Sequence, residues 1–234
     1  KYLSHEEQKY YERLVKDWMG LDVKGEKEEL VGQTLLSAGN VAKSTKNAEN
    51  AELYAEAWQV AIKNPDSQIL DNNIQLLEGV IKGLEISISM SASDKNKQAA
   101  AEAQFYAKQQ ELRITKAART IQDGEEYKNF PNEDQKKAKI GEVKKFAENE
   151  LNRKEKAENE YEHKLIEMRN KGADENLINL MKQLPAIIID NPHLQEQITE
   201  MAEKGKSKNI VGLIEMLLQM IAAGFLAPGE ELMP

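Results

Sequence analysis

The side chains best suited to acid–base chemistry or metal binding are the histidines and the carboxylates near them. The histidines are His5, His163 and His193. None has a second histidine three or four residues away, which is the spacing that places two ligands on one helix face. Glutamates at 160, 162 and 167 surround His163, but they lie in a segment rich in Lys and Glu. This pattern is typical of a solvated helix surface, so neither a metal site nor a cofactor is expected.

Two other positions could carry chemistry. Glu215 is the one carboxylate in an apolar stretch, where burial could raise its pKa and make it a general acid, although a paired structural glutamate is the favoured interpretation. The sequence Gly205-Lys206-Ser207 ends like a phosphate-binding loop but has Glu200 where the loop needs its first glycine. A turn between two helices is therefore favoured there, and the sequence predicts no enzyme.

Composition favours an all-α protein. Of the 234 residues, 31% are charged and 6% are aromatic, which is the balance of helix-rich chains. The net charge of −8 argues against binding nucleic acid, because phosphate contacts need clustered Lys and Arg. The chain has no cysteine, which excludes disulfides, thiolate metal sites and cysteine nucleophiles.

Helical periodicity is strong in the first 65 residues. A capping box of Ser4 and Glu7 opens a helix that runs to Gly20. A short helix should carry residues 30–36, with a break in the Ser-Ala-Gly-Asn run at 37–40. A third helix covers 53–62, and Pro65 ends it.

Three longer elements follow. Apolar residues from Ile69 to Leu84 recur at helical spacing, and although Ile86, Ile88 and Met90 alternate with serines as in a strand, one helix running into this segment is favoured. Asp94 caps an alanine-rich helix that ends near Gln122. Asn132 and Gln135 open a helix of nearly forty residues, about 60 Å long, with a thin apolar stripe that resembles a coiled-coil seam.

The C-terminal part is more aliphatic. An apolar segment precedes Pro185, a second covers 187–189, and a helix opens at Asn191-Pro192. The last helix, from about Ser207, is apolar nearly all round. It is either core, a groove-binding helix for a partner, or an element that touches a membrane.

These elements predict a globular helical body with a long projecting antiparallel coiled-coil hairpin. Residues 1–92 form the N-terminal helical part of the body, residues 93–172 form the hairpin with its turn at about 123–132, and residues 173–234 form the C-terminal part. The hairpin offers interleaved charges and small residues, which suit binding to another protein or to itself.

A binding partner should leave exposed apolar residues on otherwise polar helices. Ile114, Tyr127 and Phe130 are the candidate partner-binding residues near the hairpin. Phe130→Asp is expected to abolish partner binding and to leave helicity intact.

The cysteine-free, Lys- and Glu-rich pattern over 94–171 and its helical flanks resembles the coiled-coil secreted effectors of intracellular bacteria, of the Legionella LidA type. This resemblance implies a virulence protein that binds a host Rab GTPase in the host cytosol or on vesicle membranes, touching the membrane indirectly at most. It rests on no signature motif, so it assigns no binding residue. The alternative is a cytoplasmic or secretion-apparatus structural protein, similar to a tip or translocator component, whose hairpin self-associates and whose last helix contacts lipid.

Overall fold

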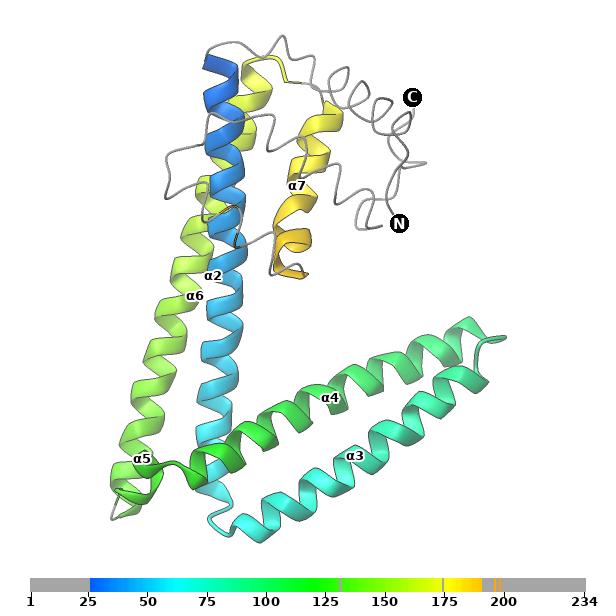
Figure 1. Ribbon diagram of the computed structural model, residues 1–234, viewed down its shortest axis with the longest axis vertical. Coiled ribbons are helices and arrows are strands. Elements are labelled where there is room, and N and C mark those ends of the chain that lie inside the picture. The colour runs from blue at the N-terminus through cyan, green and yellow to red at the C-terminus, as the bar shows by residue number, and fades with distance from the viewer. Residues whose placement is uncertain (1–25, 131, 174, 191–195, 197, 199–234) are drawn as a thin grey trace. The chain divides into compact units, whose positions relative to one another are not determined.

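The computed structural model describes residues 26–130, 132–173, 175–190, 196 and 198, and every regular element in this part of the chain is a helix. The fold is all-α, as predicted. The helices are α2 (Glu26–Lys63), α3 (Ser67–Met90), α4 (Lys95–Asp123), α5 (Glu125–Lys128), α6 (Glu133–Asn170) and α7 (Glu175–Asp190) (Figure 1). The helices expected near residues 4–20 and from Ser207 lie outside the described residues.

Helix α2 is one continuous helix of 38 residues, so the break expected at 37–40 is absent. Gly39 sits inside it, where glycine costs about 1 kcal/mol relative to alanine. The reason is packing: a Cβ built at Gly39 would lie 2.6 Å from Cγ2 of Ile198. The missing side chain lets Ile198 approach the helix backbone and complete the core there.

The long helix α6 has the ends that its sequence predicts. The Asn132 side chain accepts a hydrogen bond from the Gln135 backbone N–H at 2.9 Å. At the other end Gly172 has a φ of 81°, and the N–H groups of Gly172 and Ala173 donate to the carbonyls of Arg169 and Met168, both at 3.0 Å. This pair of bonds is the glycine-dependent C-terminal cap that satisfies the last helical carbonyls.

The chain divides into two compact units. Helices α2 and α6 are shared between them, because one half of each helix belongs to unit 1 and the other half to unit 2. Unit 1 comprises Lys1–Asn47 and Leu151–Pro234, and unit 2 comprises Ala48–Glu150. The divisions therefore fall inside the two 38-residue helices rather than at the predicted boundaries 92/93 and 172/173. Each half of α2 packs against the half of α6 in the same unit.

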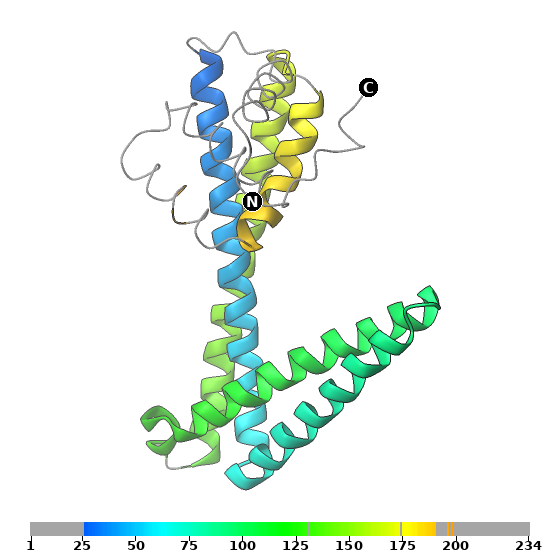
Figure 2. The same cartoon turned by 45° about the vertical axis from the view of Figure 1, so that its right-hand side comes forward.

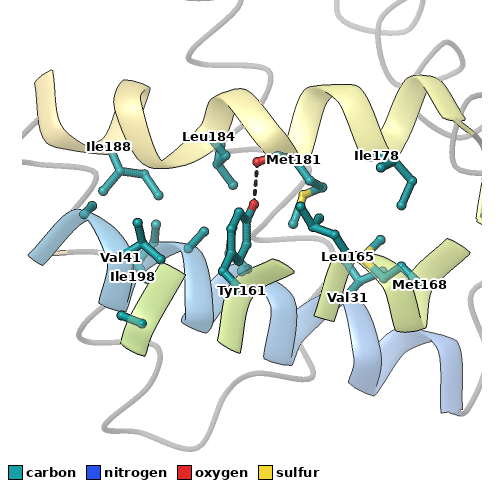
Figure 3. Close-up of a cluster of buried hydrophobic side chains, with 14 of the residues drawn as sticks. Val31, Val41, Tyr161, Leu165, Met168, Ile178, Met181, Leu184, Ile188 and Ile198 are labelled. Atoms are coloured by element: carbon teal, nitrogen blue, oxygen red, sulfur yellow. Dashed lines mark hydrogen bonds between the residues drawn. The ribbon is translucent and has the colours of Figure 1, made fainter. Parts of the chain in front are cut away.

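The core of unit 1 lies between α2, α6 and α7, and Figure 3 shows its side chains. Pro185, expected between two apolar segments, lies inside α7. A proline here cannot donate to the carbonyl four residues earlier, that of Met181. The buried hydroxyl of Tyr161 in α6 donates to this carbonyl instead (Figure 3). A side chain of a neighbouring helix therefore supplies the hydrogen bond that the proline removes.

In unit 2, α3 and α4 form a long antiparallel hairpin. The two helices lie side by side in both views (Figures 1 and 2). The segment expected to pair with 133–171 thus pairs with α3. The connection between α3 and α4 spans 91–94, short enough to return the chain directly, and Asp94 caps α4 by accepting from the Lys97 N–H at 3.3 Å. Residues 86–90 are helical, which confirms the favoured interpretation over the strand.

Candidate protein-interaction surface

The three predicted partner-binding residues do not form an exposed apolar group. Tyr127 in α5 is buried, with 8% of its surface exposed, and Phe130 is half-buried against the same cluster of unit 2. Ile114 is half-buried on α4 and lines a cleft. The expectation of exposure was therefore wrong for Tyr127 and Phe130, because both pack on Trp58.

Trp58 in α2 is the centre of this aromatic cluster and is 1% exposed. The rings of Tyr127 and Phe130 lie 6.0 and 5.9 Å from it, and Phe130 meets it edge-on at 82°. Lys139 of α6 places its Nζ 5.8 Å from the Trp58 ring and pairs with Glu126 at 2.6 Å. The carboxylate hydrogen bond raises the pKa of Lys139, so it remains a cation over the ring. Phe130→Asp would damage this core and cannot report on binding alone.

Residues around this cluster also cap the C-terminal end of helix α2. Pro65 has no N–H to donate to the carbonyl of Ala61, four residues earlier. That carbonyl accepts from the Tyr127 hydroxyl at 3.0 Å and from the Gln122 side-chain amide at 3.1 Å. The same solution thus serves both units: a tyrosine from another helix satisfies the carbonyl that a proline leaves without its helical donor.

The inner seam of the α3–α4 hairpin follows a heptad pattern on α3. The spacing between successive seam residues alternates between four and three: Leu70, Ile74, Leu77, Ile81, Leu84 and Ile88. Leu70, Leu77 and Ile81 are buried, and the other three are half-buried. Such spacing keeps one stripe of a helix on its neighbour along the whole length. The seam therefore fixes which sides of α3 remain for other contacts.

One side of the hairpin carries ion pairs. Glu78 pairs with Lys116 at 2.7 Å, and Asp71 pairs with Arg119 at 2.9 Å. We call this the ion-pair flank; its charged positions are Asp71, Glu78, Lys82 and Glu85 on α3 and Arg113, Lys116 and Arg119 on α4. Both side chains of the Glu78–Lys116 pair are about half exposed, and such pairs contribute about 0–1 kcal/mol. This flank is a solvated surface.

Arg119 also pairs with Asp123, and this hydrogen bond lowers the pKa of the Asp123 carboxyl. Its stabilising effect is therefore present above the unfolded pKa of the carboxyl and is lost as the pH falls through the lowered folded value. We expect Arg119→Gln to return the pKa of Asp123 toward its usual range in a carboxyl-detected NMR titration. Lys116→Gln, which removes the neighbouring pair with Glu78, should leave Asp123 unchanged. An Asp123 pKa unaffected by Arg119→Gln would contradict the pairing.

The opposite side of α3 carries a second heptad stripe, one position before the inner seam. It comprises Ile69, Asn73, Leu76, Val80, Gly83, Ser87 and Met90, again at spacings of four and three. None of these residues is charged. Leu76 is 68% exposed and Met90 is 80% exposed. A helix with two adjacent heptad stripes can pack on two neighbours, and α3 has one described neighbour along the inner seam, α4.

Helix α4 continues this surface with two alanines among larger residues. Glu111 and Ile114 line one cleft with Asn73 of the second stripe. Ala100, Gln104 and Ala107 precede them on α4 at the same spacings of four and three, which places them on the same side. Together with the second stripe of α3, these α4 residues form what we call the apolar flank. An added Cβ at Gly79 or Gly83 would meet no described atom within 4 Å, so a neighbouring backbone can come close to α3 there. Glu111 is the one charged residue of the flank, and it pairs with Lys108 at 2.6 Å.

A cleft of about 440 Å³ opens where the apolar flank meets the end of α2. It is lined by Glu56, Gln59, Val60 and Lys63 of α2, Leu70 and Asn73 of α3, and Glu111, Ile114 and Thr115 of α4. The cleft and the flank share Asn73, Glu111 and Ile114. Of the three predicted partner-binding residues, Ile114 thus belongs to the surface that the structure brings together.

Sequence reasoning missed the α3 stripe although its signal is in the chain. The predicted candidates all lie between 114 and 130, whereas the apolar residues from Ile69 to Leu84, taken together, predict a single helical face. Two interleaved heptads in one helix, with all four charges at other positions, would have indicated a second packing surface.

Other chemical features are sparse in the part of the chain that the structure describes. His163 is exposed on α6. Among the described residues no group of three or more His, Cys, Asp or Glu is placed to hold a metal ion, and no described helix is long and apolar enough to span a membrane. Glu215 and residues 205–207 lie outside the described residues.

No protein-family model, curated protein or solved structure matches this chain. The apolar flank of unit 2 is accordingly judged on its own residues.

Proposed function

We propose that this chain is a non-catalytic protein-interaction module and that the apolar flank of its α3–α4 hairpin is the docking surface. The observation that carries the proposal is the uncharged heptad stripe of α3, with Leu76 and Met90 largely exposed. Fully burying an aliphatic side chain of this size contributes about 1.5–3 kcal/mol. Several such residues in one line favour a partner that covers them together.

The shape of the flank suits a helix. The α3 part of the flank carries the large side chains of Leu76, Val80 and Met90, and the α4 part includes the small residues Ala100 and Ala107. A partner helix can place its own side chains over the alanines and between Leu76 and Val80. The cleft at the base, with Ile114, offers a pocket for one larger side chain of the partner.

The resemblance to secreted coiled-coil effectors supplies one candidate partner, a host Rab GTPase, and with it a place in the host cytosol or on vesicle membranes. The second candidate function is self-association, as in a structural or secretion-apparatus component. It is favoured by a particular observation: the α3 stripe of the flank carries no charge that would repel a second copy.

The test compares two neighbouring substitutions that add the same charge. Leu76→Glu places a carboxylate in the apolar flank, and Gln75→Glu places one beside it on exposed surface. Proteins captured from eukaryotic and bacterial lysates would be quantified for the wild type and both variants, with purified Rab GTPases in their GDP and GTP states measured separately. We expect Leu76→Glu to reduce binding of the captured partner at least tenfold and Gln75→Glu to change it little.

Circular dichroism of both variants checks that helicity is retained. Equal capture by Leu76→Glu and wild type would contradict the flank as the docking surface. Absence of binding to the purified GTPases in both nucleotide states would exclude Rab GTPases as the partner. The docking surface would then be tested by the capture comparison alone.

A further inference from the structure

We infer that the apolar flank is covered by the apolar flank of a second copy of this chain, with the two hairpins antiparallel so that α3–α4 and its copy form a four-helix bundle. The inference rests on the proposed function, because it takes the flank to be a docking surface and names the occupant.

The distribution of charge permits self-pairing. When a surface pairs with itself across a twofold axis, charges near the axis meet their own copies and repel. The four charges of α3 all lie on the ion-pair flank, and the border positions Asn72, Gly79 and Ile86 are uncharged. Glu111 on α4 is held by Lys108. A second copy therefore brings no like charges of α3 together.

The ends of the hairpin favour the antiparallel arrangement. At the tip, where α3 is connected to α4, lie Asp94, Lys95 and Lys97, and the Asp94 carboxylate pairs with Lys97 at 3.5 Å. The cleft at the base, beside the end of α2, carries Glu56 and Glu111 with Lys63, and Glu111 also pairs with Lys108 at 2.6 Å. A parallel pair would place tip lysines beside tip lysines. An antiparallel pair places the tip of one copy, which carries two lysines and one aspartate, beside the base of the other, whose cleft carries two glutamates and one lysine.

The sizes of the stripe residues also match in the antiparallel arrangement. Centred between Val80 and Gly83, the two α3 stripes place Leu76 opposite Ser87 and Val80 opposite Gly83 of the second copy. Leu76 and Val80 then each face a small residue, as in close helix packing, and Met90 faces Asn73. A parallel pair would place Gly83 opposite Gly83 and Ser87 opposite Ser87, which leaves gaps where the antiparallel pair has contacts.

The available area is sufficient. The 24 residues of α3 span about 36 Å. Two helices about 9 Å apart make the flank about 18 Å wide, and the resulting area of about 650 Å² per copy is near the roughly 800 Å² per partner of stable interfaces. The α3 stripe alone would supply about half of this. The α4 residues of the flank are thus needed for the pair, and they include Ala100 and Ala107, which allow close approach.

The first experiment measures mass in solution. Sedimentation velocity of the full chain from about 1 to 100 µM should show a dimer for the wild type and for Gln75→Glu, and Leu76→Glu should weaken dimerisation at least tenfold. A wild-type monomer throughout this range would overturn the inference. A dimer that Leu76→Glu leaves unchanged would also overturn it, since the chain would then pair through another surface.

The orientation is tested with cysteines, because the chain has none of its own. An equimolar mixture of Leu76→Cys and Ser87→Cys chains should form disulfide-linked dimers on mild oxidation faster than either variant alone. Glu85→Cys, on the ion-pair flank, should not cross-link. Faster linking of Leu76→Cys to itself would indicate a parallel pair and overturn the arrangement.

The two proposals fail separately. A monomeric wild type whose partner capture is still lost in Leu76→Glu would keep the docking surface and remove the second copy as its occupant. A wild type with neither dimer nor flank-dependent capture would remove both.

Discussion

Replacing Trp58 with alanine is expected to lower the free energy of unfolding by about 3–5 kcal/mol, the usual cost of removing a large buried aromatic side chain. Trp58 contacts Tyr54, Tyr127 and Phe130, and Lys139 lies over its ring. Its removal leaves a cavity where α2, α5 and the segment before α6 meet. Because whole domains are stable by about 5–15 kcal/mol, unit 2 would lose a large share of its stability.

The measurement is urea denaturation followed by circular dichroism. Trp58→Phe is the matched control: it keeps an aromatic ring, and the indole N–H that it removes has no hydrogen-bond partner among the described residues. We expect Trp58→Phe to lower the free energy of unfolding much less than Trp58→Ala does. A loss below about 1 kcal/mol for Trp58→Ala would contradict the central place of this side chain in unit 2.

The second large effect concerns Tyr161 and Pro185 in unit 1. Tyr161→Phe leaves the buried carbonyl of Met181 without its donor, and an unsatisfied buried polar group costs about 1–3 kcal/mol. Burial also raises the pKa of Tyr161, so the hydroxyl remains a donor at neutral and moderately alkaline pH. In a Pro185→Ala background the new backbone N–H can donate to Met181 instead.

A double-mutant cycle separates this account from simple loss of packing. The cost of Tyr161→Phe should be clearly smaller in Pro185→Ala than in the wild type. Tyr106→Phe, at an exposed tyrosine of α4, should cost little in either background. Equal costs of Tyr161→Phe in the two backgrounds would mean that the hydroxyl does not replace the bond that Pro185 removes.

Local signals in the sequence located the helix ends well. Asp94 and Asn132 cap α4 and α6 as predicted, and Pro65 follows the end of α2. These features depend on residues within one turn of one another, so the sequence alone determines them. The failures at 37–40 and at Pro185 have a different origin. Contacts from Ile198 and Tyr161, distant in the chain, compensate for a glycine and a proline that would otherwise interrupt a helix.

The pairing of helices was harder to predict because several segments carry compatible stripes. The long apolar stripe of 133–170 suggested that this helix pairs with 94–122. The structure instead pairs α4 with α3, to which the short connection at 91–94 joins it. Connection length was the available signal, since helices joined by a few residues become antiparallel neighbours. The candidate surface was missed for a related reason. Helix α4 covers one stripe of α3, and the second stripe can be recognised as uncovered only once that pairing is known.

The most direct test of the docking surface is site-specific photo-crosslinking in the full chain. A benzophenone amino acid at position 76 should yield covalent adducts with a bound protein, either a second copy or another partner, identified by mass spectrometry. The same group at position 85, exposed on the ion-pair flank, should yield none. Adducts from 76 alone would support the apolar flank as the interaction surface, whereas equal adducts from both positions, or adducts from 85 alone, would contradict it.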